Sequence, residues 1–216
     1  MSREYYSVER VLERVTPAEY AIYVFVVCSA IFIVPGQVFF LSIDEGMRGV
    51  RNGFMMLLGT LTAQSVLLVS LCLGFLIVLQ HFLVVLRFVG GILLVVLGVS
   101  AIYRGVKGGK INVGETRGVH YMRGFLLTIF NPPLILWYVT VGSTMLEMGV
   151  LALGNLAYVL FSMSLLASPT IITAAIVLSV QGGRRLIGMR EIRILSIVSG
   201  TAFILIALTM IVPLLI

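Results

Sequence analysis

Long apolar stretches separated by short polar ones dominate this chain. A helix that crosses a bilayer needs roughly 20 consecutive, mainly apolar residues, and six stretches reach that length. These predicted spans are residues 17–41, 53–79, 82–102, 123–146, 150–180 and 194–215. The pattern therefore predicts an all-α membrane protein with six transmembrane helices.

Proline interrupts the first and the fourth of these spans. Pro35 and Gly36 are followed directly by Gln37, and Asn131 is followed by Pro132 and a second proline. Proline donates no amide hydrogen bond and clashes with the preceding helical turn. In a bilayer, the freed backbone groups are tolerated only against protein or a wet cavity. Each break is thus either a packed structural kink or the end of a half-helix that lines a substrate site.

The two breaks occupy corresponding positions in two halves of three spans each. An odd number of spans inserts the halves in opposite orientations, which is the inverted-repeat plan of many secondary transporters. This correspondence favours a cavity between the breaks over two unrelated kinks. The predicted organisation is an N-terminal segment (1–16), a first three-helix repeat (17–102), a basic loop (103–122) and a second three-helix repeat (123–216). A shorter interruption is also expected around Pro169 in the fifth span.

The N-terminal segment shows the periodicity of an amphipathic helix. Its apolar stripe consists of Val8, Val11, Leu12 and Val15. Such a helix either lies on the membrane surface or forms a solvated tail. Thr16 and Glu19 then have the spacing of a capping box, which predicts that the first span begins near Pro17.

Composition agrees with a membrane protein. The chain has 216 residues, of which 60% are hydrophobic and 11% charged, and its mean hydropathy is +1.13. A soluble domain is about half apolar and a quarter charged. The net charge of +6 does not require nucleic acid as a partner, because basic loops are topology signals in membrane proteins.

The basic residues are distributed unevenly between the predicted connections. Of 15 Lys and Arg residues, those in or beside the connections after spans one, three and five are Arg48, Arg51, Arg104, Lys107, Lys110, Arg117, Arg123, Arg184, Arg185, Arg190 and Arg193. The positive-inside rule places these connections in the cytoplasm. A plasma-membrane protein with both termini outside is therefore expected.

The residues for enzyme chemistry are not grouped in a usable pattern. Cys28 and Cys72 do not form a CxxC pair, and His81 and His120 are far apart without clustered acids or thiols. We expect no metal site, no cofactor and no enzymatic activity. Both histidines are predicted at interfacial or loop positions.

Several polar residues near the breaks are candidates for substrate binding. Gln37 either faces the bundle and binds a carboxylate or amine, or satisfies the broken backbone. Gln64, inside the second span, either hydrogen-bonds a neighbouring helix or contacts substrate. Asn131 either satisfies freed backbone groups or binds substrate. The predicted substrate-binding residues are Pro35, Gly36, Gln37, Gln64, Asn131 and Pro132.

A proton-coupled transporter also needs a titratable group. Asp44 and Glu45 are the acids nearest a break, and Asp44 is the predicted coupling residue. The alternative is an exposed loop carboxylate that pairs with Arg48 four residues later. Arg48 is also suited to hold an anionic substrate group at the cytoplasmic entrance.

Three motifs resemble those of the lysine exporter superfamily (LysE/RhtB type). Val34-Pro35-Gly36, followed by the run from Gly46 to Phe54 and then Gly59, resembles its first signature. The run from Gly124 to Pro132 resembles its second signature, and the glycine pattern from Val89 to Val99 is similar to the family's third span. Gln37 departs from this pattern, because the family usually has proline there, as does Pro133, where the family usually has lysine.

The resemblance implies export of amino acids or related small metabolites, generally driven by the proton gradient. We therefore predict a secondary transporter that exports a small polar metabolite, with an amino acid as the favoured cargo. An inorganic cation transporter on the same fold is the alternative. The expected partners are a small-molecule substrate and the lipid bilayer. A homo-oligomer is also considered, since the glycine-rich second and third spans pack either within the monomer or between copies.

Overall fold

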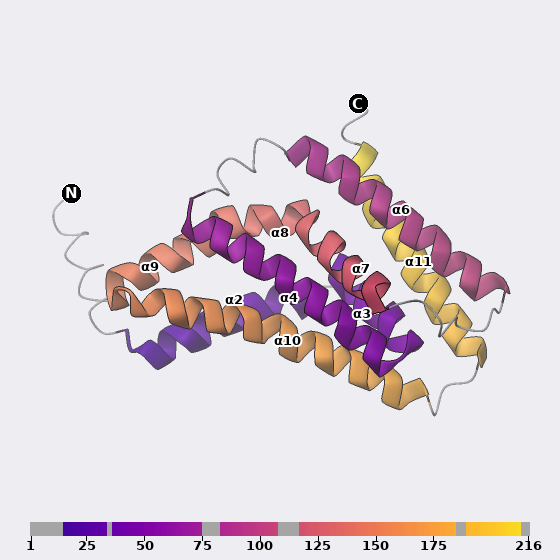
Figure 1. Ribbon diagram of the computed structural model, residues 1–216, viewed down its shortest axis with the longest axis horizontal. Coiled ribbons are helices and arrows are strands. Elements are labelled where there is room, and N and C mark those ends of the chain that lie inside the picture. Colours follow the sequence, from indigo (N-terminus) through magenta and orange to yellow (C-terminus); the bar gives the residue numbers. More distant parts are fainter. Residues whose placement is uncertain (1–14, 34–35, 75–82, 108–116, 185–188, 213–216) are drawn as a thin grey trace.

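The computed structural model describes residues 15–33, 36–74, 83–107, 117–184 and 189–212. These residues form helices and no strands, which confirms the all-α prediction for the described part of the chain (Figure 1). In chain order the helices are α2 (Pro17–Ile33), α3 (Gln37–Arg48), α4 (Val50–Cys72), α6 (Leu83–Lys107), α7 (Arg117–Ile129), α8 (Pro132–Trp137), the π-helix η2 (Tyr138–Gly142), α9 (Ser143–Leu153), α10 (Leu156–Arg184) and α11 (Met189–Ile211).

Three stretches of helix are long and apolar enough to cross a membrane. They are Val50–Cys72, Pro132–Leu153 and Leu156–Gly183, and shorter apolar helices cover Pro17–Ala30, Phe88–Tyr103 and Ile197–Ile211. Each of these stretches overlaps one of the six predicted spans, with different bounds. The first of them along the chain is shorter than the predicted span 17–41, because α2 ends at Ile33 and a separate helix, α3, begins at Gln37.

Three helix pairs make up most of the structure: α4 with α7, α2 with α10, and α6 with α11. Glycines allow two of these pairs to approach closely. A Cβ atom on Gly59 would collide with the Tyr121 carbonyl, and one on Gly124 would collide with the Met56 carbonyl. Similarly, a Cβ on Gly98 would lie 2.8 Å from the carbonyl oxygen of Gly200. These glycines of the second and third spans therefore pack within the monomer.

The short helix α3 lies among the longer ones, in contact with α4, α7, α10 and α11 (Figure 1). The predicted boundaries are wrong here. Residues 42–52 were expected to form a polar connection, but α3 continues to Arg48 and α4 begins at Val50. Gly49 alone joins the two helices, with φ at 147°. Glycine adopts this conformation readily because it has no Cβ.

The break in the fourth span lies where it was predicted. Helix α7 ends at Ile129 and α8 begins at Pro132. Asn131 caps α8, because its side-chain oxygen accepts a hydrogen bond from the amide of Leu134 (3.4 Å). Proline fits this first turn, where its missing N–H would have no helical partner. The fourth span therefore consists of two helical parts.

Two other predictions about the second half are wrong. The expected interruption at Pro169 is absent, since α10 continues through this proline. The expected connection around Glu147 is helical, because α9 runs to Leu153 and the turn comes at Gly154. In addition, α6 and α7 extend into the segment 103–122 from both sides, to Lys107 and from Arg117.

The start of the first span is as predicted. The amide of Thr16 donates to the Glu19 carboxylate (2.9 Å), and the amide of Glu19 donates to the Thr16 hydroxyl (3.3 Å). This reciprocal pair is a capping box. The amphipathic segment predicted before it, as well as Pro35 and His81, lie outside the described residues.

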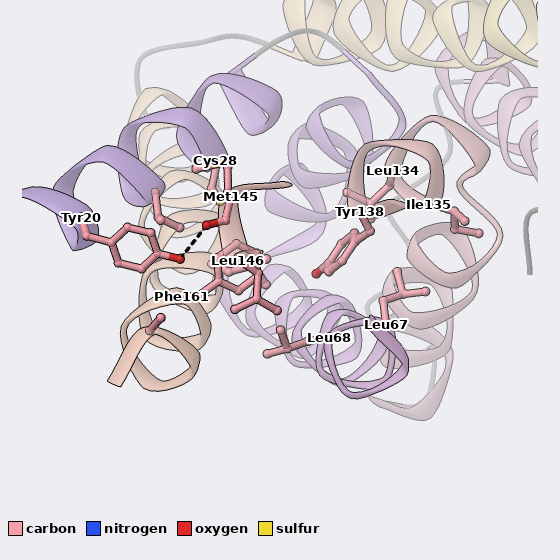
Figure 2. Packing of buried hydrophobic residues seen from close by; sticks show 13 residues of the cluster. Tyr20, Cys28, Leu67, Leu68, Leu134, Ile135, Tyr138, Met145, Leu146 and Phe161 are labelled. Carbon is pink, nitrogen blue, oxygen red and sulfur yellow. Dashed lines mark hydrogen bonds between the residues drawn. The ribbon is translucent and has the colours of Figure 1, made fainter. Parts of the chain in front are cut away.

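An apolar core joins α2, α4, α8, α9 and α10 on one side of the molecule (Figure 2). Tyr138 and Phe161 are among its largest fully buried side chains. The Tyr20 hydroxyl donates to the carbonyl of Met145 across this core (3.0 Å). The core therefore ties the start of the first span to the end of the fourth.

The glycine contact between α4 and α7 gives a direct test of this packing. We expect Gly124→Val to lower the free energy of unfolding by about 1–3 kcal/mol or more, because the larger side chain forces the two backbones apart. Gly118→Val is the matched control on α7, since a Cβ atom there meets nothing within 4 Å. Thermal unfolding of the detergent-purified variants measures both effects. Equal melting temperatures for the two variants would contradict this packing.

Candidate functional site

The first candidate residue, Gln37, opens α3 and is buried, with 4% of its surface exposed. Its side-chain Nε2 donates to the Met210 sulfur of α11 (3.2 Å). Its Oε1 atom is buried and has no hydrogen-bond partner among the described residues. Gln37 therefore faces the interior of the bundle with an unused acceptor.

The two helix breaks converge around one residue of α11. A Cβ atom on Gly90 would collide with the Phe130 carbonyl and would lie 2.8 Å from the terminal methyl of Met210. Gln37 reaches the sulfur of the same methionine. The start of α3 and the end of α7, next to Asn131, thus lie close together in space although about 94 residues separate Gln37 from Asn131 along the chain.

Unpaired polar groups also lie between α4 and α7. Gln64 and Thr128 are buried, and neither Gln64 Nε2 nor the Thr128 hydroxyl has a hydrogen-bond partner in the described part of the chain. Gly124 packs against the backbone of Thr60. Thr128 comes four residues after Gly124, and Gln64 comes four residues after Thr60, which is about one helical turn in both helices. Because Gly124 lies beside Thr60, this register places Thr128 level with Gln64.

The prolines after Asn131 add free acceptors at this level. Pro132 and Pro133 have no N–H, so the carbonyls of Thr128 and Ile129 lose their helical donors. Of the two uses considered for Asn131, its side-chain oxygen serves as a helix cap. We call Gln37, Gln64, Thr128 and Asn131, with the freed carbonyls, the mid-depth cluster. Buried polar atoms without partners are rare in folded proteins, so this cluster is suited to a polar ligand.

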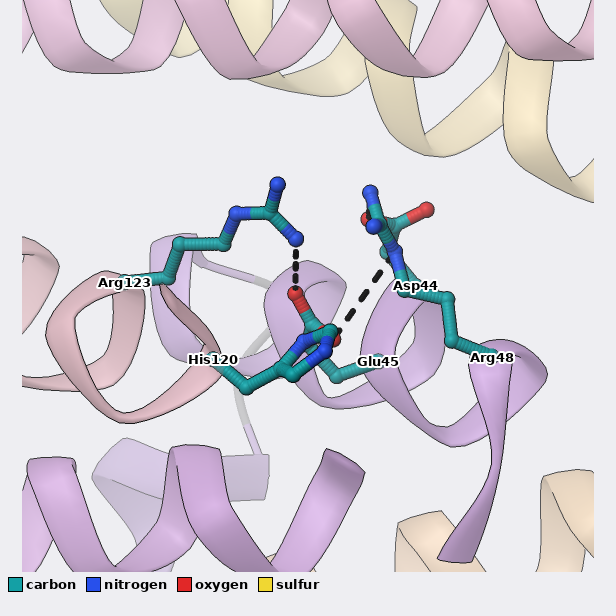
Figure 3. A network of polar contacts seen from close by, with 5 residues as sticks. All are labelled: Asp44, Glu45, Arg48, His120 and Arg123. Atoms are coloured by element: carbon teal, nitrogen blue, oxygen red, sulfur yellow. Dashed lines mark hydrogen bonds and ion pairs between the residues drawn. The ribbon is translucent and has the colours of Figure 1, made fainter. Parts of the chain in front are cut away.

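A buried network of charged residues lies further along α3 (Figure 3). Glu45 is fully buried and contacts α7 through both oxygens. Its Oε2 lies 2.7 Å from His120 Nδ1, and its Oε1 accepts a hydrogen bond from Arg123 Nη1 (2.8 Å). Arg48 binds Asp44 Oδ2 through Nη2 (3.1 Å) and Nε (3.2 Å). We call these five residues the charge network.

The face of α3 explains why these groups share one surface. Gln37, Leu41 and Glu45 follow one another at intervals of four residues, which places them on one side of a helix. Leu41 packs in an apolar cluster with Leu127 of α7, between the two polar regions. This face of α3 therefore runs from Gln37, which contacts Met210 of α11, to Glu45, which contacts α7 in the charge network.

The charge network corrects three expectations from the sequence. The pairing of Asp44 with Arg48 is confirmed, but both side chains are buried rather than exposed in a loop. His120 is not a loop or interfacial residue: it is 1% exposed on α7. Neither Glu45 nor Arg123 was among the predicted site residues. The sequence feature that could have indicated this network is the spacing of His120 and Arg123. Residues three apart lie on the same face of a helix, and both belong to α7, which begins at Arg117.

A comparison with known families covers most of the chain rather than one motif. The family model described as LysE type translocator matches residues 29–213. This match includes both helix breaks and the entire charge network. The chain belongs to the LysE type translocator family.

Membership in this family confirms the predicted resemblance to the lysine exporter superfamily. LysE type translocators are multi-pass membrane transporters rather than enzymes. No curated relative and no solved structure matches the chain. Residue roles in this LysE type translocator therefore have to come from its own geometry.

A separate hollow of about 320 Å³ lies at the far end of α4. Leu71, Ser143, Glu147 and Tyr158 are among the residues that line it. Along α4, the buried core residues Leu67 and Leu68 come between this hollow and Gln64. In the present conformation of the translocator, the apolar core thus separates the hollow from the mid-depth cluster.

The unpaired amide of Gln64 predicts a change in stability. Replacing a buried, unsatisfied polar group by an apolar one of similar shape removes its desolvation cost, which is about 1–3 kcal/mol. We expect Gln64→Met to raise the melting temperature of the substrate-free translocator. Ser65→Ala is the control on the same helix, because the Ser65 hydroxyl already donates to the Leu61 carbonyl. A lower melting temperature for Gln64→Met would show that the amide has a partner.

Proposed function

We propose that this LysE type translocator is a secondary transporter that exports an amino acid, or a closely similar polar metabolite, in exchange for protons. The observation that carries the proposal is the pair of unused groups on Gln37 and Gln64. Gln37 Oε1 is an acceptor and suits an ammonium group, whereas Gln64 Nε2 is a donor and suits a carboxylate. An amino acid presents both.

The backbone at the two breaks completes the proposed binding site. Gly36 is extended just before α3 begins, and Pro132 opens α8 behind the Asn131 cap. The freed carbonyls of Thr128 and Ile129 are further acceptors for an ammonium group. We propose that these residues contribute to a broken-helix site of the kind that transporters of this general plan place near the bilayer midplane. Pro35, which the sequence assigned to the same site, lies outside the described residues.

The helix pairs support two inverted repeats, residues 17–102 and 123–216. A two-fold exchange would replace the first, second and third spans by the fourth, fifth and sixth. Because α2 and α10 belong to the first and fifth spans, the exchange would turn their pair into one between the fourth and second spans, which is α7 with α4. The pair α6 with α11 belongs to the third and sixth spans and would be unchanged. These are the pairs that the chain forms. We therefore propose that one repeat rocks against the other, so that the site opens to each side in turn.

The proposed topology places the charge network toward the cytoplasm and both termini outside the plasma membrane. The basic residues of the first, third and fifth connections favour this orientation. Arg48 would then draw the anionic group of a substrate toward the entrance, and Asp44 is a candidate for proton coupling. Because both residues are buried here, the entrance has to open before substrate can pass.

An inorganic cation remains a second candidate cargo. The freed carbonyls and Gln37 Oε1 are neutral oxygen ligands, which hard cations accept. Among the described residues, however, no carboxylate lies in the mid-depth cluster, which disfavours a divalent ion. The amino acid remains the preferred cargo because it also uses the donor on Gln64.

Transport into inverted membrane vesicles tests the cargo. We expect an acidic vesicle interior to drive accumulation of at least one amino acid, up to about tenfold for one proton and a gradient of one pH unit. Vesicles without the translocator, and vesicles without a pH gradient, are the controls. If folded protein accumulates no amino acid, and cations but not amino acids raise its melting temperature, the cation alternative holds.

Gln37 provides a test of the binding site itself. Gln37→Leu should weaken amino-acid binding about tenfold, which corresponds to the loss of one hydrogen bond to a charged group. Ser42→Ala is the control on α3, since the Ser42 hydroxyl donates to its own helix at Val38. Binding is measured by thermal shift at increasing substrate concentration. A Gln37→Pro variant with unchanged substrate preference would show that the side chain does not contact substrate.

A further inference from the structure

The charge network contains a proton site that the sequence did not indicate. We propose that Glu45 and His120 together bind the coupling proton, and that its binding weakens the contact between α3 and α7. This inference rests on the proposed proton-coupled export and assigns the coupling group. It moves that role from Asp44 to a pair of residues that joins the two halves of the chain.

The contact between Glu45 and His120 already requires a shared proton. The distance of 2.7 Å between Oε2 and Nδ1 is that of a strong, charge-assisted hydrogen bond. When the neutral imidazole is protonated at Nδ1, it donates to the carboxylate, and the pair carries a single negative charge. A second proton makes the pair neutral overall, either as an imidazolium beside a carboxylate or as a neutral imidazole beside a protonated carboxyl.

The charges of the network decide what the second proton does. With one shared proton, the negative charge of the Glu45–His120 pair holds Arg123 of α7 through a hydrogen bond of 2.8 Å to Glu45 Oε1. A second proton cancels this negative charge and weakens the contact between Glu45 and Arg123. Weakening one member of a buried ion pair is unfavourable, so protonation favours a conformation in which α3 and α7 separate.

The helices packed around α3 carry few other charged residues. Helix α10 has no Asp, Glu, Lys or Arg between Leu156 and Gly183. Arg51 on α4 and Arg193 on α11 are exposed cations, and Arg190 and Glu191 also belong to the first turn of α11. Among the residues of α4, α7, α10 and α11 whose side chains the structure describes, none is an acid.

The position of the pair explains why it, rather than Asp44, suits coupling. Asp44 and Arg48 are four residues apart on one helix, so their contact survives any rigid movement of α3. Glu45 belongs to the first predicted repeat, and His120 opens the helix that leads into the second. Their contact forms only when α3 and α7 meet. Proton binding at this pair is therefore linked to the relative movement that alternating access requires.

The proton follows a simple path in this scheme. In the state open to the outside, the pair takes up the second proton from the external solution. In the state open to the cytoplasm, it releases that proton, and α3 and α7 close after substrate has entered. One proton then moves inward for each substrate exported.

The first experiment compares transport variants in liposomes. Glu45→Gln and His120→Gln should retain exchange of internal for external amino acid at equal pH. Both should lose accumulation driven by a pH gradient, which falls from about tenfold to equilibrium. Glu147→Gln, an exposed carboxylate on α9, is the control and should accumulate substrate like the wild type. Normal accumulation by Glu45→Gln, or loss of accumulation in Asp44→Asn alone, would overturn the proposal.

The second experiment does not depend on the cargo. The chain has two histidines, so ¹⁵N-histidine labelling gives two sets of imidazole signals, and either His81→Gln or His120→Gln assigns them. We expect the His120 signals of the wild type to report uptake of a proton as the pH is lowered, and Glu147→Gln to leave this uptake unchanged. If His120 keeps one protonation state throughout, the proposal is wrong. If no amino acid is transported but His120 titrates, the proposed cargo fails and the proton site stands.

Discussion

The break between α2 and α3 is the constraint on which this structure depends. A continuous first span would carry Gln37, Leu41 and Glu45 along one straight helix at the edge of the bundle. Separated from α2, the short helix α3 instead packs among α4, α7, α10 and α11. One of its faces then has an unused hydrogen-bonding group at Gln37, beside Met210 of α11, and charges paired with α7 at Glu45.

Close packing by glycine makes this arrangement possible. The carbonyls of Tyr121 and Met56 lie where a Cβ of Gly59 or Gly124 would otherwise be. The resulting approach of α4 to α7 brings Gln64 level with Thr128 and buries both. It also holds α7 in the position where His120 reaches Glu45. The same device recurs between α6 and α11, so the glycines form packing contacts rather than flexible points.

The sequence predicted the features that depend on local chemistry. Proline chemistry located the break at Asn131, the capping box at Thr16 was found by its spacing, and the motifs identified the family. Two uses were considered for Gln64, a hydrogen bond to a neighbouring helix and a contact with substrate, and its Nε2 has no partner among the described residues. That outcome depends on which groups α7 brings opposite it, and a single helix does not contain this information.

The sequence failed where charges look exposed but are paired. Asp44, Glu45 and Arg48 were interpreted as part of a polar loop, because a hydropathy pattern counts every charged residue as polar, whether or not its charge is paired in the fold. In the folded chain they neutralise one another and the residues of α7, so the helix continues through them. His120 was misplaced for the same reason, since its partner lies 75 positions away in the chain. The prediction for Pro169 was wrong in the opposite direction, because a helix break was expected there and α10 continues through this proline.

The central claim is that contact between α3 and α7 depends on the protonation of the charge network. Spin labels at positions 51 and 118 test it most directly, because both positions are exposed, position 51 follows the end of α3 across Gly49, and position 118 lies in the first turn of α7. With exposed Cys72 replaced by serine, double electron–electron resonance measures the distance between the labels. We predict that lowering the pH from about 8 to about 5 shifts the distances to longer values, and that Glu45→Gln abolishes this shift. Identical distance distributions at both pH values in the unsubstituted network would contradict the account.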